Sequence, residues 1–198
     1  MRNIKKVGLL IGLLASPALI FLYLVTFTTN HYDLPYFFPL VDENTKEYQM
    51  QGSDTVYYQI DRSAFISGNK EAHCNVSVVS ILPEHCDENC QRQIMNFSSL
   101  QDVLKTFPDN CLAVYYYGAL EESLAERNIS RVYEMDSVNR ADILHTFKLN
   151  TEEAKGAETI LIDQQGRIRG FFELSNSKDL DRLFAEIKIL NHNLADND

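Results

Sequence analysis

The hydrophobic pattern of this chain begins with one long apolar run. Residues 7–29 carry no charge and follow three basic residues within the first six positions. The most apolar part, residues 7–25, has about the length that a helix needs to cross a bilayer. Basic residues before the run, and none directly after it, predict that the N-terminus lies in the cytoplasm. We therefore predict a cytoplasmic tip over residues 1–6 and an uncleaved transmembrane anchor over residues 7–27.

A cleaved signal peptide is the alternative interpretation of this run. The run is long for the apolar core of a signal peptide, and no A-x-A-like cleavage site closes it cleanly. No cysteine lies in or just after the run, which excludes a lipoprotein anchor. The pattern favours an anchor, with residues 31–198 outside the cytoplasm. We expect a single-pass protein of the inner (plasma) membrane with its soluble domain on the periplasmic side.

Beyond the anchor, a juxtamembrane linker is predicted over residues 28–50. Two prolines in residues 31–39 favour extended backbone. The aromatic residues of this segment suit either the membrane interface or a contact with the soluble domain. The linker itself carries no candidate chemistry.

The rest of the chain alternates between strand and helix patterns. Residues 76–82 form a short apolar run rich in β-branched residues, typical of a buried parallel strand. Apolar residues recur at helical spacing over residues 89–107. Two apolar runs late in the chain flank Gly166, which predicts a β-hairpin. The predicted strands are 55–60, 76–82, 112–117, 131–135, 159–163 and 167–172. The predicted helices are 89–107, 119–127, 137–149 with Ser137 as its cap, and 177–191.

This order of elements predicts one domain of the α/β class. A βαβ part followed by a β-hairpin and a terminal helix is the arrangement of the thioredoxin-like fold. We expect a central mixed sheet flanked by helices over residues 51–192, with residues 193–198 as an acidic tail. A domain of this length can bury a hydrophobic core large enough for stability without disulfide bonds or a structural metal.

The charge of this domain limits its partners. Three of the chain's 18 Lys and Arg residues, and none of its 28 Asp and Glu residues, lie in the first thirty positions, so the remainder has a net charge of −13. That balance argues against binding of nucleic acid or anionic lipid head groups.

Candidate chemistry is concentrated in Cys86 and Cys90, which directly follow the first buried strand. If the helix begins near Cys86, positions i and i+4 share one face and the sulfurs can meet. Such a pair can cycle between dithiol and disulfide, can hold a soft metal ion, or can be an inert staple. The three intervening residues distinguish it from the two-residue spacing of thioredoxin-like redox motifs.

These residues resemble the Sco/SenC family of membrane-anchored copper chaperones for cytochrome oxidase assembly. The likeness rests on the N-terminal anchor, the C-x-x-x-C after a strand, the late hairpin ILIDQQGRIRGFF and the juxtamembrane LPYFFP. It covers roughly residues 31–190. The resemblance implies a thioredoxin-like fold and copper ligation by Cys86 and Cys90. It also implies an extracytoplasmic protein client, with a copper subunit of cytochrome oxidase as the candidate.

The sequence departs from the family pattern in two places and from the pattern of ordinary thioredoxins in one. Neither cysteine is followed by the family's proline. The family's third copper ligand is a histidine that would fall near Lys155, and residues 154–159 contain none. That loop also lacks the proline that ordinary thioredoxins place beside their dithiol. Among the other histidines, His73, His85 and His145 are each expected to be exposed or hydrogen-bonded rather than ligands.

The surroundings of the pair leave its thiolate chemistry open. Glu84, Asp87 and Glu88 disfavour thiolates by like-charge repulsion, whereas a helix N-terminus favours them. The other two cysteines, Cys74 and Cys111, stand at the starts of predicted neighbouring strands. They can form a second disulfide or be small buried residues, and we favour the second interpretation.

Three functional classes follow from the sequence. The first is a copper chaperone and the second a tethered thiol–disulfide oxidoreductase. The third is a redox-silent interaction module in which Cys86 and Cys90 form a structural disulfide. We favour a Sco-like thiol protein that serves copper delivery or redox maintenance of an oxidase copper site, with Cys86 and Cys90 as both redox residues and metal ligands.

Overall fold

The structure is a computed structural model that describes residues 15–23, 34–61, 74–107, 109–117, 124–125, 129, 131–136 and 139–195. The chain divides into two compact units, Met1–Asp33 and Leu34–Asp198. In the first unit, residues 15–23 are helical. The predicted anchor over residues 7–27 extends at both ends outside the described residues. Among the residues that are described, none belongs to a helix of the length and hydropathy that a bilayer crossing requires.

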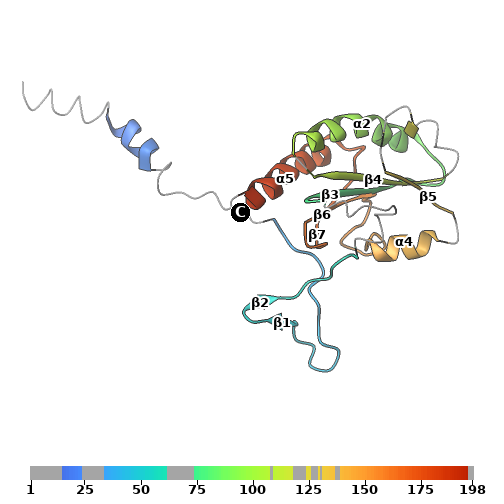
Figure 1. Cartoon of the computed structure of the whole chain (residues 1–198), viewed down its shortest axis with the longest axis horizontal. Helices are drawn as coiled ribbons and strands as arrows, with labels where there is room; N and C mark the ends of the chain where they lie inside the picture. The colour runs from blue at the N-terminus through green and yellow to red at the C-terminus, as the bar shows by residue number, and fades with distance from the viewer. Residues whose placement is uncertain are drawn as a thin grey trace, which may run out of the picture. The chain divides into compact units, whose positions relative to one another are not determined.

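The second unit contains a five-stranded mixed sheet with the order β5-β4-β3-β6-β7 (Figure 1). The central strand β3 is parallel to β4 and antiparallel to β6. β4 is parallel to β5, and β6 and β7 form the hairpin predicted from the sequence. The strands are β3 (Ser77–Ile81), β4 (Cys111–Tyr116), β5 (Val132–Glu134), β6 (Thr159–Ile162) and β7 (Ile168–Phe172). This order and these directions are those of the predicted thioredoxin-like fold.

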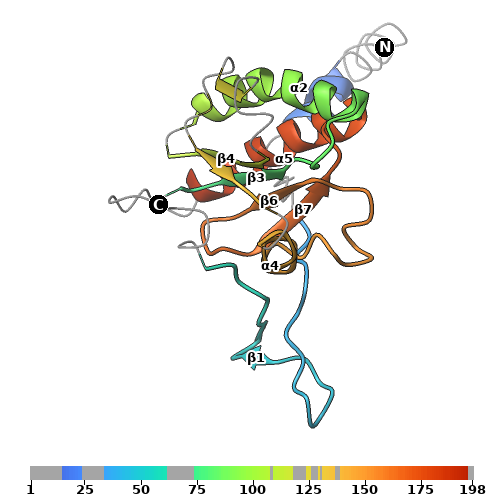
Figure 2. The ribbon, with the colours of Figure 1, turned by 90° about the vertical axis from the view of Figure 1, so that its right-hand side faces the viewer.

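Helices cover both faces of the sheet, as Figures 1 and 2 show. Helices α2 (Glu88–Lys105) and α5 (Ser177–Ala195) lie on one face, and α4 (Arg140–Thr146) lies on the other. Alternation along each strand divides the core accordingly. In β3, Val78 packs in the cluster of α2 and α5, whereas Val79 packs with Phe147 beside α4.

Helix boundaries differ in places from the sequence prediction. The predicted cap Ser137 lies outside the described residues, and α4 begins at Arg140 with Asn139 in the cap position. Helix α5 continues to Ala195, one turn beyond the predicted end at residue 191. Most of the predicted helix over residues 119–127 lies outside the described residues.

The segment that opens the second unit is held against the sheet. The Phe37 amide donates to the Ile168 carbonyl at 3.3 Å, beside β7. The rings of Phe37 and Phe38 meet the ring of Phe171 edge-on, with centroids 5.1 and 6.0 Å apart. The sequence left open whether these aromatic residues lie at the membrane interface or contact the soluble domain. The structure shows contact with the domain.

A small hairpin follows this segment. It pairs β1 (Met50–Gln51) with β2 (Asp54–Thr55). The predicted strand over residues 55–60 is therefore wrong as a continuous element. Beyond Thr55, pairing is reduced to isolated bridges from Tyr57 to Pro39 and from Gln59 to Arg167. The composition of residues 55–60 predicted a strand here, but the described residues beside it supply only those isolated bridges.

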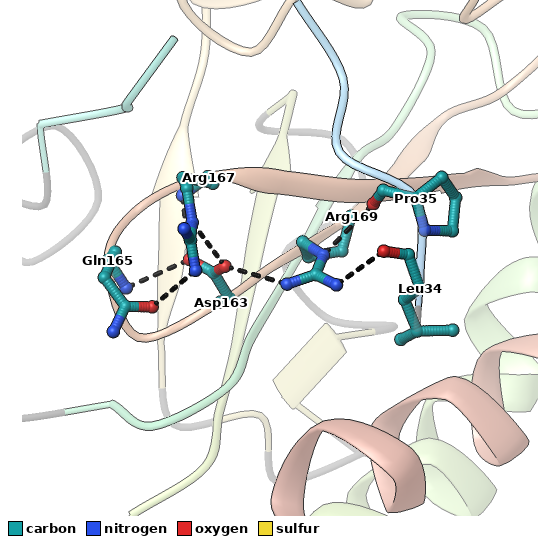
Figure 3. Close-up of polar contacts among 6 residues, drawn as sticks. All are labelled: Leu34, Pro35, Asp163, Gln165, Arg167 and Arg169. Carbon is teal, nitrogen blue, oxygen red and sulfur yellow. Dashed lines mark hydrogen bonds and ion pairs between the residues drawn. The ribbon is translucent and has the colours of Figure 1, made fainter. Parts of the chain in front are cut away.

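Arg169 anchors the same segment from inside the sheet (Figure 3). Its side chain is 6% exposed. Its Nη2 donates to the Leu34 carbonyl at 2.7 Å and its Nε donates to the Pro35 carbonyl at 3.1 Å. Its Nη1 donates to Asp163 Oδ2 at 3.2 Å, and its guanidinium lies 3.8 Å from the centroid of the Tyr36 ring. The buried guanidinium of Arg169 is therefore both ion-paired and hydrogen-bonded, as a stable buried ion requires.

Asp163 also shapes the turn between β6 and β7. Its Oδ1 accepts hydrogen bonds from the amides of Gln165 and Arg167, both at 3.0 Å. Gly166 closes the turn with φ of +83°, and a Cβ at this position would lie 2.6 Å from the Ile60 carbonyl oxygen. The glycine predicted at this turn is thus required by backbone conformation and by close packing.

Candidate dithiol site

Cys86 and Cys90 lie where the chain leaves the central strand and enters α2. The helix predicted over residues 89–107 begins at Glu88, with Asp87 as its N-cap. Cys86 is therefore a loop residue, whereas Cys90 is the third residue of the helix. The prediction that the sulfurs meet is confirmed, because the two residues form a disulfide with a Cα–Cα distance of 5.1 Å.

The two sulfurs differ in burial. Cys90 is 2% exposed and belongs to the core, whereas Cys86 is only partly buried. The side-chain amide of Gln91 donates to Cys86 Sγ at 3.5 Å. The side of this bond that faces solvent is therefore that of Cys86.

Asp87 caps the helix between the two cysteines. Its Oδ1 accepts a hydrogen bond from the Cys90 amide at 3.0 Å, which satisfies one of the free N–H groups of the first turn. Its own carbonyl accepts from the Gln91 amide at 3.0 Å. A short polar side chain after a strand and before an apolar helical pattern is the sequence signal for such a cap.

A buried polar network supports the first turns of α2. Gln93 Nε2 donates to Ser80 Oγ at 2.7 Å, and Ser80 Oγ lies 2.8 Å from Thr159 Oγ1. All three side chains are at most 2% exposed. The network joins the helix that carries Cys90 to strands β3 and β6. Sequence reasoning missed it, although a glutamine on an otherwise apolar helix face was the available signal.

Glu158 is a second group that sequence reasoning missed. Its carbonyl accepts a hydrogen bond from the Ile81 amide at 2.8 Å, so it stands beside the end of β3 that leads to the cysteines. Its Oε2 is buried and has no hydrogen-bond partner among the residues that the structure describes. Burial, and then the charges of Glu173 and Asp87, raise its pKa to about 7. It lies in the loop where the sequence lacks both histidine and proline.

An open cleft adjoins the first turn of α2. Its volume is about 440 Å³ and its walls are polar. Asn89, the neighbour of Cys90, lies on one side, and the loop between β7 and α5 lies on the other. The cleft is lined by Asn89, Arg92, Glu173, Ser175, Asn176 and Ser177.

The predicted copper ligands lack a third partner within the described part of the chain. No group of three or more His, Cys, Asp or Glu side chains arranged to hold a metal occurs there. His85 is exposed, and His145 is exposed on α4 across the sheet. His73 lies outside the described residues, and Lys155 is an exposed loop residue.

Cys74 and Cys111 form the second disulfide, with a Cα–Cα distance of 5.7 Å. The interpretation favoured from the sequence, two small buried thiols, is therefore wrong. The positions were predicted correctly, because Cys111 begins β4 and Cys74 shortly precedes β3, its parallel neighbour. Both are buried, at 1% and 9% exposure, and Arg131 Nη1 lies 2.8 Å from Cys74 Sγ. This bond lies at the opposite end of the strands from Cys86.

No family model and no curated protein sequence matches this chain. Several solved structures do match this chain. A SCO1/SenC family lipoprotein from Bacillus anthracis strain Ames is 17% identical, with a TM-score of 0.46 over 61% of this chain and 83% of its own. BsSco, a member of the Sco family of cytochrome c oxidase assembly proteins, is 12% identical, with a TM-score of 0.43 over 61% and 82%. The thioredoxin domain of a thiol-disulfide oxidoreductase from Bacteroides vulgatus is 14% identical, with a TM-score of 0.41 over 59% and 81%.

The strand order and the helix placement of this chain establish the fold independently of those neighbours. The second unit is a thioredoxin-like domain, and proteins of the Sco/SenC family are among those it resembles.

Proposed function

We propose that this protein is a membrane-anchored thiol–disulfide exchange protein of Sco-like fold, with Cys86 and Cys90 as its redox residues. The observation that carries the proposal is the Cys86–Cys90 disulfide, which joins a partly exposed sulfur to a buried one beside the central strand. That asymmetry suits a two-step exchange, because the outer sulfur meets the partner and the inner one resolves the intermediate.

In the proposed exchange, two electrons pass from the two cysteines to a partner disulfide. The Cys86 thiolate attacks one sulfur of a partner disulfide, forms a mixed disulfide and expels one partner thiolate. The Cys90 thiolate then attacks Cys86 Sγ, closes the Cys86–Cys90 bond and expels the second partner thiolate. Two protons from the cysteines end on the partner, which has gained two electrons. The reverse sequence oxidises a partner dithiol.

The Cys74–Cys111 bond does not compete for this role. Both of its cysteines are buried, so a partner thiolate has no approach comparable to that offered by Cys86. The bond instead joins the segment just before β3 to the first residue of β4. The proposal therefore assigns one disulfide to chemistry and the other to the scaffold.

Copper delivery is the second candidate function. The observation that favours it is the pair of adjacent sulfurs, because two soft thiolates select Cu(I). The described residues supply no third ligand, so tight Cu(II) binding is not expected. In either form, the proposed setting is the periplasmic side of the inner membrane. The proposed client is an extracytoplasmic protein, with an oxidase copper subunit as the candidate that the resemblance implies.

Trapping of the intermediate tests the exchange function. The full-length protein in membrane vesicles, carrying Cys90→Ser, should accumulate a mixed disulfide between Cys86 and glutathione when oxidised glutathione is added. Cys86→Ser is the matched control and should accumulate much less, because the remaining thiol is buried. Equal labelling of the two variants would contradict the assigned order of attack.

Anaerobic titration of the reduced protein with Cu(I) separates the two candidates. Copper delivery predicts about one Cu(I) bound per chain, lost in Cys86→Ser and in Cys90→Ser. Exchange without copper binding supports the oxidoreductase alone. If neither activity occurs and the substitutions only lower stability, the Cys86–Cys90 bond is a structural disulfide without redox function.

A further inference from the structure

The second disulfide closes a loop that contains the whole dithiol segment. Cys74 and Cys111 are 37 positions apart, and β3, both cysteines of the candidate site and all of α2 lie between them. The proposed function leaves this bond to the scaffold. A cation beside one of its sulfurs, however, points to chemistry at this bond as well.

Arg131 directs its guanidinium at Cys74. Its Nη1 lies 2.8 Å from Cys74 Sγ. Arg131 directly precedes β5, and its carbonyl accepts a hydrogen bond from the Val114 amide at 2.9 Å, so the backbone that carries this side chain is held against β4. No carboxylate of the described residues forms an ion pair with Arg131. A half-buried guanidinium is thus placed beside sulfur without an anionic partner.

The value of this contact depends on the redox state of the sulfur. A disulfide sulfur is neutral and is only a weak hydrogen-bond acceptor. A thiolate carries a full negative charge, which an adjacent arginine stabilises. Arg131 therefore stabilises the opened bond more than the closed one. A disulfide whose reduced form is stabilised in this way is easier to reduce.

The other polar groups at this end of the strands do not cancel the charge of Arg131. Asn110 accepts a hydrogen bond from the Val76 amide through its Oδ1 at 3.2 Å. Its Nδ2 is a buried donor that has no hydrogen-bond partner among the described residues. Asp109 supplies a carboxylate in the same turn, but it is exposed, so solvent screens its charge. The local balance favours a negative charge on the sulfur of Cys74.

We propose that Cys74–Cys111 is a second redox site, which a low-molecular-weight thiol opens to leave Cys74 as a thiolate paired with Arg131. Cys111 is the less buried of the two, at 9% exposure against 1%. The thiolate of the small thiol attacks Cys111 Sγ, forms a mixed disulfide and expels the Cys74 thiolate. A second small thiol then displaces Cys111.

This reaction balances with two small thiols for each bond opened. The two thiols lose two electrons and become one disulfide, and the Cys74–Cys111 bond gains those electrons. Of the two protons released, one ends on Cys111 and the other passes to water, because Cys74 remains a thiolate. Opening removes the covalent closure of the loop that carries α2, so the redox state of this bond controls the stability of the domain.

Redox equilibration with glutathione tests the proposal. The full-length protein in detergent, without denaturant, is equilibrated with buffers of reduced and oxidised glutathione, and free thiols are alkylated. Combined cleavage after Glu, Lys and Arg places Cys74 and Cys111 on peptides free of Cys86 and Cys90. Mass spectrometry then gives the reduced fraction of each pair. The wild-type Cys74–Cys111 bond should open as reduced glutathione is raised, while circular dichroism shows that the domain stays folded.

Variants of Arg131 test the cause. Arg131→Gln removes the charge, and the equilibrium constant should shift toward the disulfide by about tenfold, or about 30 mV. Arg131→Lys keeps the charge and should retain most of the wild-type value. Arg140→Gln, at an exposed residue of α4, is the control for net charge and should leave the equilibrium unchanged.

Two outcomes would overturn the second redox site. One is a wild-type Cys74–Cys111 bond that glutathione reduces only after denaturant has unfolded the domain, and this measurement decides even if a variant fails to fold. The other is an Arg131→Gln protein whose equilibrium matches that of Arg140→Gln. Neither outcome affects the proposed exchange at Cys86 and Cys90, which is measured on separate peptides.

Discussion

The Oδ1 atom of Asp87 accepts a hydrogen bond from the Cys90 amide at 3.0 Å, so one carboxylate caps α2 and separates the two bonded cysteines. The start of the helix and the redox segment are thus the same stretch of chain. Any change in this side chain affects helix stability through the hydrogen bond and sulfur chemistry through the charge. The two effects can be separated by substitutions that keep one and remove the other.

Asp87→Ala should lower the free energy of unfolding of the oxidised protein by about 1 kcal/mol, because the cap is lost. Asp87→Asn should lower it much less, because asparagine caps helices about as well as aspartate. Urea denaturation of both variants at neutral pH measures the difference. Equal losses in the two variants would show that the charge, and not the hydrogen bond, supports the helix.

Glu158→Gln should stabilise the protein above neutral pH. The folded-state pKa of Glu158 is raised to about 7, above the ordinary value of 4.5. Between these values the folded protein holds a proton that the unfolded chain has lost, so wild-type stability falls as pH rises through this window. Glutamine does not titrate, so this fall in stability is absent from Glu158→Gln. The stability gain of Glu158→Gln over wild type should therefore grow to about 2 kcal/mol by pH 8.

Denaturation curves between pH 4 and pH 8 measure this growth. Glu152→Gln, at an exposed carboxyl, serves as the control for a general change of net charge. A gain from Glu158→Gln that is the same at both ends of the pH range would contradict the raised pKa.

The two disulfides should contribute unequally to stability. The Cys74–Cys111 bond closes a loop with a sequence separation of 37, whereas the Cys86–Cys90 separation is 4. In the chain-entropy account, a longer loop gives the larger effect. Replacing both Cys74 and Cys111 by alanine should cost about 4 kcal/mol, and replacing both Cys86 and Cys90 about 2 kcal/mol. Denaturant midpoints of the two double variants under oxidising conditions give the ranking, and the reverse ranking would contradict it.

Arg169→Met should destabilise the domain by about 3–5 kcal/mol, because the change leaves a buried carboxylate with fewer partners. The carbonyls of Leu34 and Pro35 also lose their donor. Arg167→Met removes the more exposed partner of Asp163 and should cost about 1 kcal/mol or less. Thermal unfolding of the two variants compares them. A similar loss from both would mean that burial does not distinguish these ion pairs.

Much of the fold could be predicted because its signals are local. The apolar run of β3, the helical spacing in α2 and the glycine of the β6–β7 turn each depend on residues close in sequence. The strand predicted over residues 55–60 failed because its composition indicated pairing that the surrounding structure supplies only at isolated bridges. Tertiary context decides such cases.

The candidate site was predictable only in part. Cys86 and Cys90 stand out by spacing alone. Glu158 and Gln93 do not, because their place beside the cysteines depends on the pairing of β6 with β3 and on the packing of α2 against both. The Cys74–Cys111 bond depends likewise on the parallel register that sets Ser77 opposite Cys111. Nonlocal pairing of this kind leaves no mark within a short window of sequence.

The two buried hydrogen bonds from Arg169 to the Leu34 and Pro35 carbonyls form a clasp on the start of the domain. This clasp determines where a mechanical pull on the N-terminal side of the chain enters the domain. Tension applied to the chain ahead of Leu34 acts first on this clasp and on the hairpin of β6 and β7. It does not act first on β3, α2 or the bond between Cys86 and Cys90. The Cys86–Cys90 pair is in this way insulated from a pull on the chain ahead of Leu34, since the strain is carried by β7 at the edge of the sheet.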